Sequence, residues 1–470
     1  MTVSLPEAFI RNIRQDIPGD ADALFSVLDG TPPVSVRWNP YKTQSPAEGI
    51  PVAWCRYGRY LPERPSFTTD PLFHAGAYYV QEASSMFVEH LLRSTTEPEG
   101  ARILDLCAAP GGKATLYSTL AGGDGIVIAN EVIRSRALIL ADNIRKWGIG
   151  NTMVTNNDPA HFAGLGEWFD AVAIDAPCSG EGMFRKSPEA RGEWSEANVR
   201  LCAARQRRIV SDAWAALRPG GVLIYSTCTF NRTEDEENVR WIAEELGGED
   251  AGAMVPPDWG IEEREAGGVR CFRLWPHRIA GEGFFAAAIR KGGQRGRPLR
   301  PKPRKTLLAE ASRSETAELS RWVGQPDLMR FARIGDSLYG TAHPAWLLSP
   351  RTGASLYGYY ATPFADIRSA AEYLNTLHSG ICMGQMFGGR LKPDHSLAMF
   401  HDLARSAAAE TPLSSDEALH YLRREDFAPQ AEAAEGMNLM TFEGYALGWA
   451  KRIGNRFNNL YPKSQMILNK

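Results

Sequence analysis

The sequence predicts an α/β protein whose largest domain is a doubly wound parallel sheet, with smaller domains before and after it. Three observations support this fold class. Short apolar runs alternate with segments of helical periodicity between about residues 101 and 290. A glycine-rich turn follows the first apolar run, and acidic residues or cysteines follow the later ones. The length of 470 residues is too great for one typical domain, so two or three are expected.

The N-terminal region, residues 1–95, is predicted to be a small α+β domain. Its segment LPEAFIRNIRQDI has apolar residues near helical spacing, and AYYVQEASSMFVEHLL becomes helical toward its end. Between them, WCRYGRYLPERPSF places arginines among aromatic residues, a combination that can stack on bases and pair with phosphates. An ordinary surface loop with packed aromatic side chains explains the same stretch, and such mixtures are common.

The central region, residues 96–290, alternates strands and helices. This order implies parallel strands with helices on both faces of the sheet. Ligands then bind at the carboxyl ends of the strands. The predicted strands are ARILDL, GIVIAN, NTMVTNND, FDAVAIDA, GVLIYSTC and FFAAAIRK. The predicted helices are GGKATLYSTLAG, SRALILADNIRKWG and SEANVRLCAARQRRIVSDAWAAL.

The last third of the chain begins with a basic linker at residues 291–305. The stretch RKGGQRGRPLRPKPRK that contains it has eight basic residues, no acids, and several prolines and glycines. It could also contact a phosphate backbone. Residues 306–385 are predicted to form an intermediate domain and residues 386–470 a further small domain. Three pieces in these domains have a β-like pattern: LYGTAH, SLYGYYAT and SLAMFH.

Composition and charge narrow the class of protein. Hydrophobic residues make up 44% and charged residues 23%, as in ordinary globular proteins. The net charge of −3 gives no overall attraction to nucleic acid, so any such footprint must be local. The seven cysteines form no CxxC pair, which argues against a disulfide framework and a structural zinc site, and no metal is expected. A cytoplasmic monomer is expected, without a signal peptide or membrane span.

The first turn of the predicted sheet has the features of a cofactor site. Asp105 ends the first strand, and the turn CAAPGG leads into a helix whose N-terminus offers unpaired N–H groups. Its glycines allow the backbone to approach a ligand closely. Glu131 ends the second strand, 20 residues after Gly111, where an acid can accept both hydroxyls of a ribose. Asp158, after the third strand, could bond an adenine amino group.

Three classes of ligand use a turn of this kind. A dinucleotide site prefers GxGxxG, and a Walker A loop needs GxxxxGK[ST]; the turn PGGKAT matches neither. The remaining class is S-adenosylmethionine, whose adenosine also requires an acid at the ribose but which carries no phosphate. The glycine-rich turn together with acids at several strand ends therefore favours S-adenosylmethionine.

Two cysteines, Cys178 and Cys228, follow predicted strands at the edge where a substrate would bind, and Asp175 shares that edge. The other five cysteines fit small core residues. Methylation of cytosine C5 needs a methyl donor, an acid and a thiol together. A thiolate adds to C6 and makes C5 nucleophilic, while a carboxyl group such as Asp175 supplies a proton or hydrogen bond to N3. A base must then remove the C5 proton so that the thiolate leaves. A target base must first leave its stack.

The chemistry alone does not decide which thiol attacks. The cationic pair Arg185–Lys186, close to Cys178, could lower a thiol pKa or hold phosphate, or could be ordinary surface residues.

The motifs LDLCAAPGGK, DAPCSGEG and YSTCTF resemble those of the Nol/Nop/Sun family of RNA 5-methylcytosine methyltransferases. QEASS and the helix that carries Gln206 also match this family. The pieces RPKPRK, LKPDHSLAMF, LRRED and GYALGWAKRIGNRFNNLYP are similar to the RsmF (YebU-type) branch. The resemblance implies a Rossmann-like methyltransferase core, an N-terminal RNA-binding region and a C-terminal PUA-like RNA-binding domain. It also implies that the substrate is small-subunit (16S) ribosomal RNA and that methylation proceeds through a covalent adduct between a cysteine and C6.

The resemblance also assigns roles to individual residues. Cys228 of the Thr-Cys motif becomes the nucleophile, Cys178 of the Pro-Cys motif acts in release, and Asp175 completes the catalytic set. The cofactor S-adenosylmethionine is expected to contact Cys107, Ala108, Ala109, Pro110, Gly111, Gly112, Lys113, Glu131, Asp158 and Asp175.

Other interpretations remain open at this level. A tRNA cytosine-C5 methyltransferase shares the core motifs, and a non-catalytic RNA-binding protein could keep the same fold. An NAD-dependent oxidoreductase would need GxGxxG. The acidic run TEDEENVRWIAEEL is predicted to form the exposed first turns of a helix with Thr233 as N-cap. Trp449, in the basic segment GWAKRIGNR, fits RNA contact and packing equally well.

Overall fold

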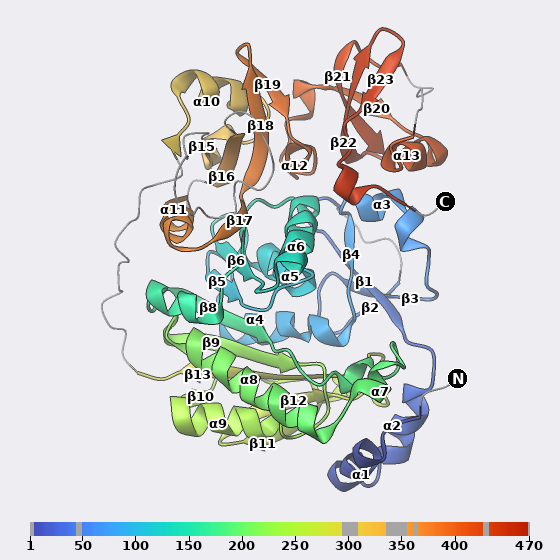
Figure 1. The fold of residues 1–470 in the computed structure, drawn as a ribbon, viewed down its shortest axis with the longest axis vertical. Coiled ribbons are helices and arrows are strands. Elements are labelled where there is room, and N and C mark those ends of the chain that lie inside the picture. Colours follow the sequence, from blue (N-terminus) through green and yellow to red (C-terminus); the bar gives the residue numbers. More distant parts are fainter. Residues whose placement is uncertain are drawn as a thin grey trace.

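The computed structural model describes residues 4–43, 49–293, 309–334, 355–360, 364–425 and 432–468. The central sheet has the strand order β11-β12-β13-β9-β8-β5-β6-β7-β17, with β10 beside β13 (Figure 1). Its middle strands, which pair in parallel, are β5 (Arg102–Asp105), β6 (Ile126–Asn130), β7 (Thr152–Thr155), β8 (Phe169–Asp175) and β9 (Leu217–Thr227). The predicted doubly wound core is thereby confirmed.

Both edges of the parallel sheet are extended by antiparallel strands. At one edge these are β10 (Gly248–Asp250), β11 (Glu262–Ala266), β12 (Val269–Leu274) and β13 (Phe284–Lys291). At the other edge β17 (Thr376–Ser379), from the intermediate region, pairs with β7. The sheet is therefore mixed, and a segment more than 200 residues downstream of β7 completes it.

Helices cover both faces of the sheet because neighbouring residues of a strand point to opposite sides. Leu104 packs with the face covered by α8 (Glu196–Trp214), α9 (Glu236–Leu246) and α11 (Phe364–Tyr373). Ile103, one residue earlier, packs with the face covered by α4 (Val88–Thr95) and α5 (Gly112–Ala121). The helix α6 (Arg134–Trp147) packs on Ala129 and Val154.

The N-terminal region forms a four-stranded sheet of order β2-β3-β1-β4. Its elements are α1 (Glu7–Asp16), α2 (Ala21–Leu28), β1 (Val34–Trp38), β2 (Ile50–Pro51), β3 (Gly58–Leu61), α3 (Pro71–His74) and β4 (Tyr78–Val80). In the arginine-rich aromatic stretch, Trp54 is buried and its Nε1 donates to the carbonyl of Ala83. Arg56 is exposed and lies over the ring of Tyr57. The tryptophan therefore packs, and the arginine head groups remain at the surface.

The last third of the chain carries two smaller sheets at the end of the molecule opposite α1 and α2 (Figure 1). The first contains β14 (Ala309–Glu310), β15 (Met329–Ile334), β16 (Ser355–Tyr360), β18 (Ile381–Phe387) and β19 (Arg390–Pro393). The second contains β20 (Ala409–Pro412), β21 (Gly436–Phe442), β22 (Tyr445–Ile453) and β23 (Arg456–Asn459). The associated helices are α10 (Arg313–Ser320), α12 (His395–Ala398) and α13 (Ser415–Leu422).

Several expectations for this region can be compared with the structure. SLAMFH is not β-like: it contains most of α12, which Asp394 caps by accepting from the N–H of Ser396. The SLYGYY part of SLYGYYAT forms β16, whereas LYGTAH and linker residues 294–305 lie outside the described residues. Trp449 is 2% exposed, packs edge-on against Trp322 and donates to the carbonyl of Asp394, so it serves packing.

No helix in the described ranges is long and apolar enough to cross a membrane.

Candidate active site

Cys178 and Cys228 meet at the carboxyl edge of the parallel sheet. Strands β8 and β9 are parallel neighbours, and Asp175 pairs with Ser226 in their register. Each chain therefore leaves the sheet at the same edge, and the two Sγ atoms lie 3.3 Å apart. The sequence motifs that carry these thiols are thus brought into one site by the sheet register.

The loop after Cys178 is locked against the end of β9. The N–H of Gly182 donates to the carbonyl of Cys228 at 2.9 Å. A Cβ atom at Gly182 would lie only 2.8 Å from that carbonyl oxygen, so the approach requires glycine. Glu181 is buried and accepts hydrogen bonds from the Phe230 N–H and the Trp194 indole. The GEG part of DAPCSGEG therefore fixes the loop that carries Cys178.

A lysine–aspartate pair lies beside the thiols. The Nζ of Lys113, in the first turn of α5, is 2.9 Å from Oδ2 of Asp175, whose Oδ1 accepts from the Ser226 hydroxyl. Burial is the largest single influence on Lys113 and opposes its charge, but the ion pair and hydrogen bond with Asp175, together with Asp105 and Cys228, raise the lysine pKa above its ordinary value. Cys228 also interacts electrostatically with this lysine. The sequence placed Lys113 only in the cofactor turn, whereas its side chain reaches the catalytic residues.

Burial and hydrogen bonding affect Cys178 strongly. Its hydrogen bond with Cys228 and its burial raise the pKa of the Cys178 thiol well above the ordinary value. Arg185 does not counter this, because its side chain donates to the carbonyls of Thr31 and Gly281 and lies 3.6 Å from Glu282. The expectation that Arg185 could lower a thiol pKa is thus not supported for Cys178.

The glycine-rich turn is shaped mainly by packing. Gly111 has φ of +122°, and a Cβ there would lie 3.2 Å from the side chain of Leu140 on α6. Asn143, also on α6, donates to the carbonyl of Pro110, and Arg136 donates to that of Ala109. The turn is therefore pressed against α6, and the close approach of a ligand to its glycines stays a prediction. Cys107 is half-buried, and its burial raises its pKa.

Three acids stand at or just after strand ends near this turn. Asp105 is 1% exposed, and neither of its carboxylate oxygens has a hydrogen-bond donor among the described residues. Burial raises the pKa of Asp105 to about 8. Glu131 is buried, accepts from the Ile133 N–H at 2.9 Å and lies 3.3 Å from Arg136. Asp158 is exposed and accepts from the Ala160 N–H.

These groups fit S-adenosylmethionine. An unpaired buried carboxylate requires a cationic or donating ligand, because leaving it unpaired is costly. The Coulomb influence of Glu131 and Asp175 on Asp105 would further oppose a phosphate-bearing ligand. S-adenosylmethionine offers a sulfonium, an ammonium and ribose hydroxyls. Val132 and Ile133, about half exposed beside Glu131, provide an apolar surface for a ring.

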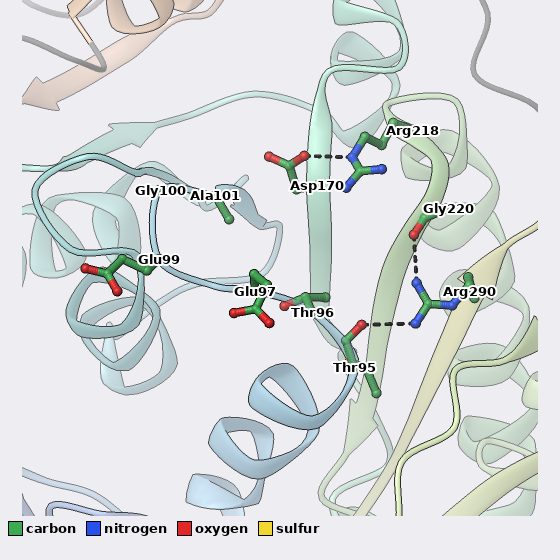
Figure 2. Close-up of a pocket in the computed structure, with 10 residues that line it drawn as sticks. All are labelled: Thr95, Thr96, Glu97, Glu99, Gly100, Ala101, Asp170, Arg218, Gly220 and Arg290. Carbon is green, nitrogen blue, oxygen red and sulfur yellow. Dashed lines mark hydrogen bonds and ion pairs between the residues drawn. The ribbon is translucent and has the colours of Figure 1, made fainter.

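A cavity of about 290 Å³ lies away from the thiols, at the amino ends of the parallel strands (Figure 2). It is lined by residues that include Thr95, Asp170, Arg218 and Arg290. The Arg218 side chain donates to Asp170 at 2.7 Å, and Arg290 donates to the carbonyls of Thr95 and Gly220 (Figure 2). Its cations are therefore already used by the protein, and the thiol site lies at the other end of the strands. In the described ranges no group of three or more His, Cys, Asp or Glu could hold a metal ion.

The acidic run after Cys228 differs from expectation. Glu234, Asp235 and Glu236 are all buried, with exposures of 0%, 0% and 2%. Helix α9 begins at Glu236, so Thr233 is not its N-cap. Asp235 and Glu236 can be buried because Arg273 on β12, also buried, donates to Glu236 at 2.6 Å and lies 3.3 Å from Asp235. The sequence pattern of this acidic run did not reveal its partner Arg273, which lies on β12, 37 residues after Glu236.

The strand order, the glycine-rich turn with its acids and the site at the carboxyl edge define an S-adenosylmethionine-dependent methyltransferase. Family models agree with this class and specify it. The model for 16S rRNA methyltransferase RsmB/F matches residues 94–290, that for the N-terminal domain of 16S rRNA methyltransferase RsmF matches 5–83, and that for the methyltransferase RsmF PUA domain matches 408–466. The chain belongs to the RsmF family of 16S rRNA methyltransferases.

Individual relatives extend over nearly the whole chain. Ribosomal RNA small subunit methyltransferase F of Salmonella agona is 32% identical, over 98% of this chain and 96% of its own length. The protein of the same name from Salmonella heidelberg has the same identity and coverage. The resemblance to this branch that the sequence motifs indicated is confirmed.

Solved structures match a little over three fifths of the chain. A methyltransferase homolog from Pyrococcus horikoshii is 26% identical with a TM-score of 0.52, and the match covers 62% of this chain and 96% of that one. NSun6 from Pyrococcus horikoshii, 20% identical with a TM-score of 0.51 over 63% of this chain and all of that one, shares the fold.

Proposed function

We propose that this protein methylates C5 of cytosine in small-subunit ribosomal RNA through a covalent adduct between cysteine and C6. The observation that carries the proposal is the pair of sulfur atoms 3.3 Å apart, with the Lys113–Asp175 ion pair at the same strand ends. A methyl donor site alone does not explain two adjacent thiols, whereas C5 methylation uses one to attack and one to release.

Cys228 is the proposed nucleophile. Its thiolate adds to C6 of the extruded base, the π electrons of the C5–C6 bond form a C4–C5 double bond, and those of the C4–N3 bond move to N3, which takes up a proton. Lys113 can supply that proton through the Asp175 carboxyl, since the two are in hydrogen-bond contact. S-adenosylmethionine, when bound, supplies the electrophilic methyl group that C5 attacks.

Cys178 is the proposed release residue. Its raised pKa keeps the Cys178 thiol protonated, so it can donate its hydrogen bond to the neighbouring sulfur of Cys228. In release, the C5 proton passes to Cys178 while the proton of Cys178 passes to the departing sulfur of Cys228. The electron pair of the C5–H bond forms the new C5–C6 double bond, the C6–S bond breaks with its electrons on sulfur, and N3 returns its proton to the Asp175–Lys113 pair.

The RNA target is supported by the relatives and the domains. The matched relatives are named as small-subunit ribosomal RNA methyltransferases, and the tail matches a PUA domain. We propose RNA binding by this tail and by the N-terminal region, where Arg56 and Arg64 are exposed.

The test combines purified protein, a labelled methyl donor and transcripts of small-subunit ribosomal RNA or tRNA. Cys228→Ala should transfer no methyl group and form no adduct. Cys178→Ala should accumulate a protein–RNA adduct that survives a denaturing gel, and Cys382→Ala, a buried thiol on β18, should behave as wild type. Methylation of tRNA alone would overturn the target. An adduct lost in Cys178→Ala instead of Cys228→Ala would reverse the roles.

A further inference from the structure

Glu234 lies between the two loops that carry the thiols and is completely buried. Its Oε2 accepts from the N–H of Ser179, the residue after Cys178, at 3.0 Å. Its Oε1 accepts from Asn231 at 2.8 Å, on the segment that follows Cys228. One carboxylate therefore joins both loops.

The loop of Cys178 is held on both sides by the same group of residues. Gln206 on α8 donates through its Nε2 to the carbonyl of Pro177 at 3.0 Å and to Glu234 at 2.7 Å. Pro177, before Cys178, is thus bonded to Gln206, and Ser179, after Cys178, is bonded to Glu234. A hydrogen bond between the hydroxyls of Ser179 and Thr229, at 3.0 Å, adds a second link between the loops.

Glu234 differs from the two acids that follow it. Asp235 and Glu236 both lie within ion-pair distance of Arg273, which fits a role in stability. Glu234 has no ion pair with any residue in the described ranges, and its hydrogen bonds reach the thiol loops through Ser179 and Asn231. A buried carboxylate without a cationic partner is costly, so its retention there points to a use in the site.

We propose that Glu234 is a positioning residue for Cys178, which holds the Cys178 loop so that its sulfur stays in contact with Cys228 during release. The proposal rests on the proposed function. Adduct formation requires Cys228, whereas release also requires Cys178 at the correct place. Loss of the Glu234 contacts should therefore impair release more than attack.

The electrostatics around the thiols are in keeping with this role. After the hydrogen bond with Cys228 and burial, the charges of Cys228 and Glu234 are further causes of the raised pKa of Cys178. Lys113 interacts with Cys228 instead. The charge of Glu234 thus acts on the thiol that is proposed for release.

The experiment uses Glu234→Gln, which keeps the length of the side chain but replaces an acceptor by a donor. Opposite the Ser179 N–H and the Gln206 amide, that donor breaks at least one hydrogen bond. The variant is incubated with an in vitro transcript of small-subunit ribosomal RNA and the methyl donor. Adduct formation is followed on denaturing gels, and the decay of the adduct is followed after competitor RNA is added. Glu234→Asp keeps the charge, and Glu237→Gln, an exposed acid three residues later in the first turn of α9, is the matched control.

Glu234→Gln should form the adduct at a rate near that of wild type and release it about 10- to 100-fold more slowly, as expected for a displaced catalytic group. Glu234→Asp should recover part of the release rate, and Glu237→Gln should match wild type. Equal losses of formation and release in Glu234→Gln would show a structural role only and overturn the proposal.

If Glu234→Gln does not fold, the same measurement on Gln206→Leu replaces it, and unchanged adduct decay there overturns the proposal. Cys178→Ala separates the two levels of inference. If Cys178→Ala traps adduct and a folded Glu234→Gln does not, Glu234 has no positioning role while the proposed function stands. If neither variant, nor wild type, forms an adduct, the proposed function itself fails.

Discussion

The ammonium of Lys113 lies 2.9 Å from the carboxylate of Asp175, which joins the first turn of α5 to the end of β8. The pair connects the cofactor turn to the thiol site, and Lys113 also packs over the ring of Phe284 at 5.1 Å. The two motifs LDLCAAPGGK and DAPCSGEG therefore meet through side chains and not only through strand order.

Lys113→Met should lower methyl transfer by about 100-fold or more, because it removes the proposed proton source and leaves Asp175 with only the Ser226 hydroxyl. Initial rates with labelled methyl donor measure the effect. Lys186→Met, which removes an exposed lysine from the loop after Cys178, is the control and should retain more than half of the activity. Equal rates for Lys113→Met and wild type would remove this lysine from the mechanism.

Asp105→Asn should weaken binding of S-adenosylmethionine and stabilise the cofactor-free protein at pH 8. The pKa of Asp105 is raised to about 8, so between about pH 4 and pH 8 the unfolded chain has lost a proton that the folded chain keeps. Stability therefore falls as pH rises through that window, and Asn removes this contribution.

Thermal unfolding at pH 5 and pH 8, with and without cofactor, measures both effects. The exposed Asp124→Asn serves as the control. If the difference in stability between wild type and Asp105→Asn were the same at pH 5 and pH 8, the role given to this carboxyl group would be contradicted.

Gly182→Ala should destabilise the site and abolish the adduct, since its Cβ would lie 2.8 Å from the Cys228 carbonyl and must push the two loops apart. We expect a loss of about 1–3 kcal/mol in unfolding free energy, the usual range for overpacking. Gly192→Ala is a matched control, because a Cβ there meets nothing within 4 Å. Denaturant unfolding and the gel assay for the adduct check both variants; a normal adduct in Gly182→Ala would mean that the loop contact is not required.

Asn157→Ala should weaken the binding of S-adenosylmethionine, although Asn157 is buried and is not among the residues expected to contact the cofactor. Its side chain accepts from the Asn375 N–H at 3.0 Å and donates to the Asn375 carbonyl, which ties the loop before Asp158 to the segment that leads into β17. Loss of both bonds frees that loop, and an increase of about 10-fold in the dissociation constant of S-adenosylmethionine is expected.

Calorimetric titration measures this constant. Asn375→Ala is the internal comparison: it keeps the backbone bonds, loses the bond from its side chain to the Asn156 carbonyl, and should have the smaller effect. The reverse order of the two variants would mean that the link to β17 does not support the cofactor site.

The sequence by itself determined the order of strands and helices in the core, the cofactor class and the family. These depend on local patterns: apolar periodicity, a glycine-rich turn and cysteines directly after strands, which the chain carries within a few residues. The parallel order of β8 and β9 then follows from general rules, so even the common edge of Cys178 and Cys228 could be anticipated.

Only the tertiary structure decided how buried charges are paired and which distant segments meet. The acidic run after Cys228 was expected at the surface because charged residues are usually exposed, whereas Arg273 on another strand allows Asp235 and Glu236 to be buried. The helix in SLAMFH has a local signal, its N-cap Asp394, whereas no local pattern indicates that β17 completes the sheet. Such contacts join residues far apart in the chain, and their energies depend on burial and geometry that exist only once the chain has folded.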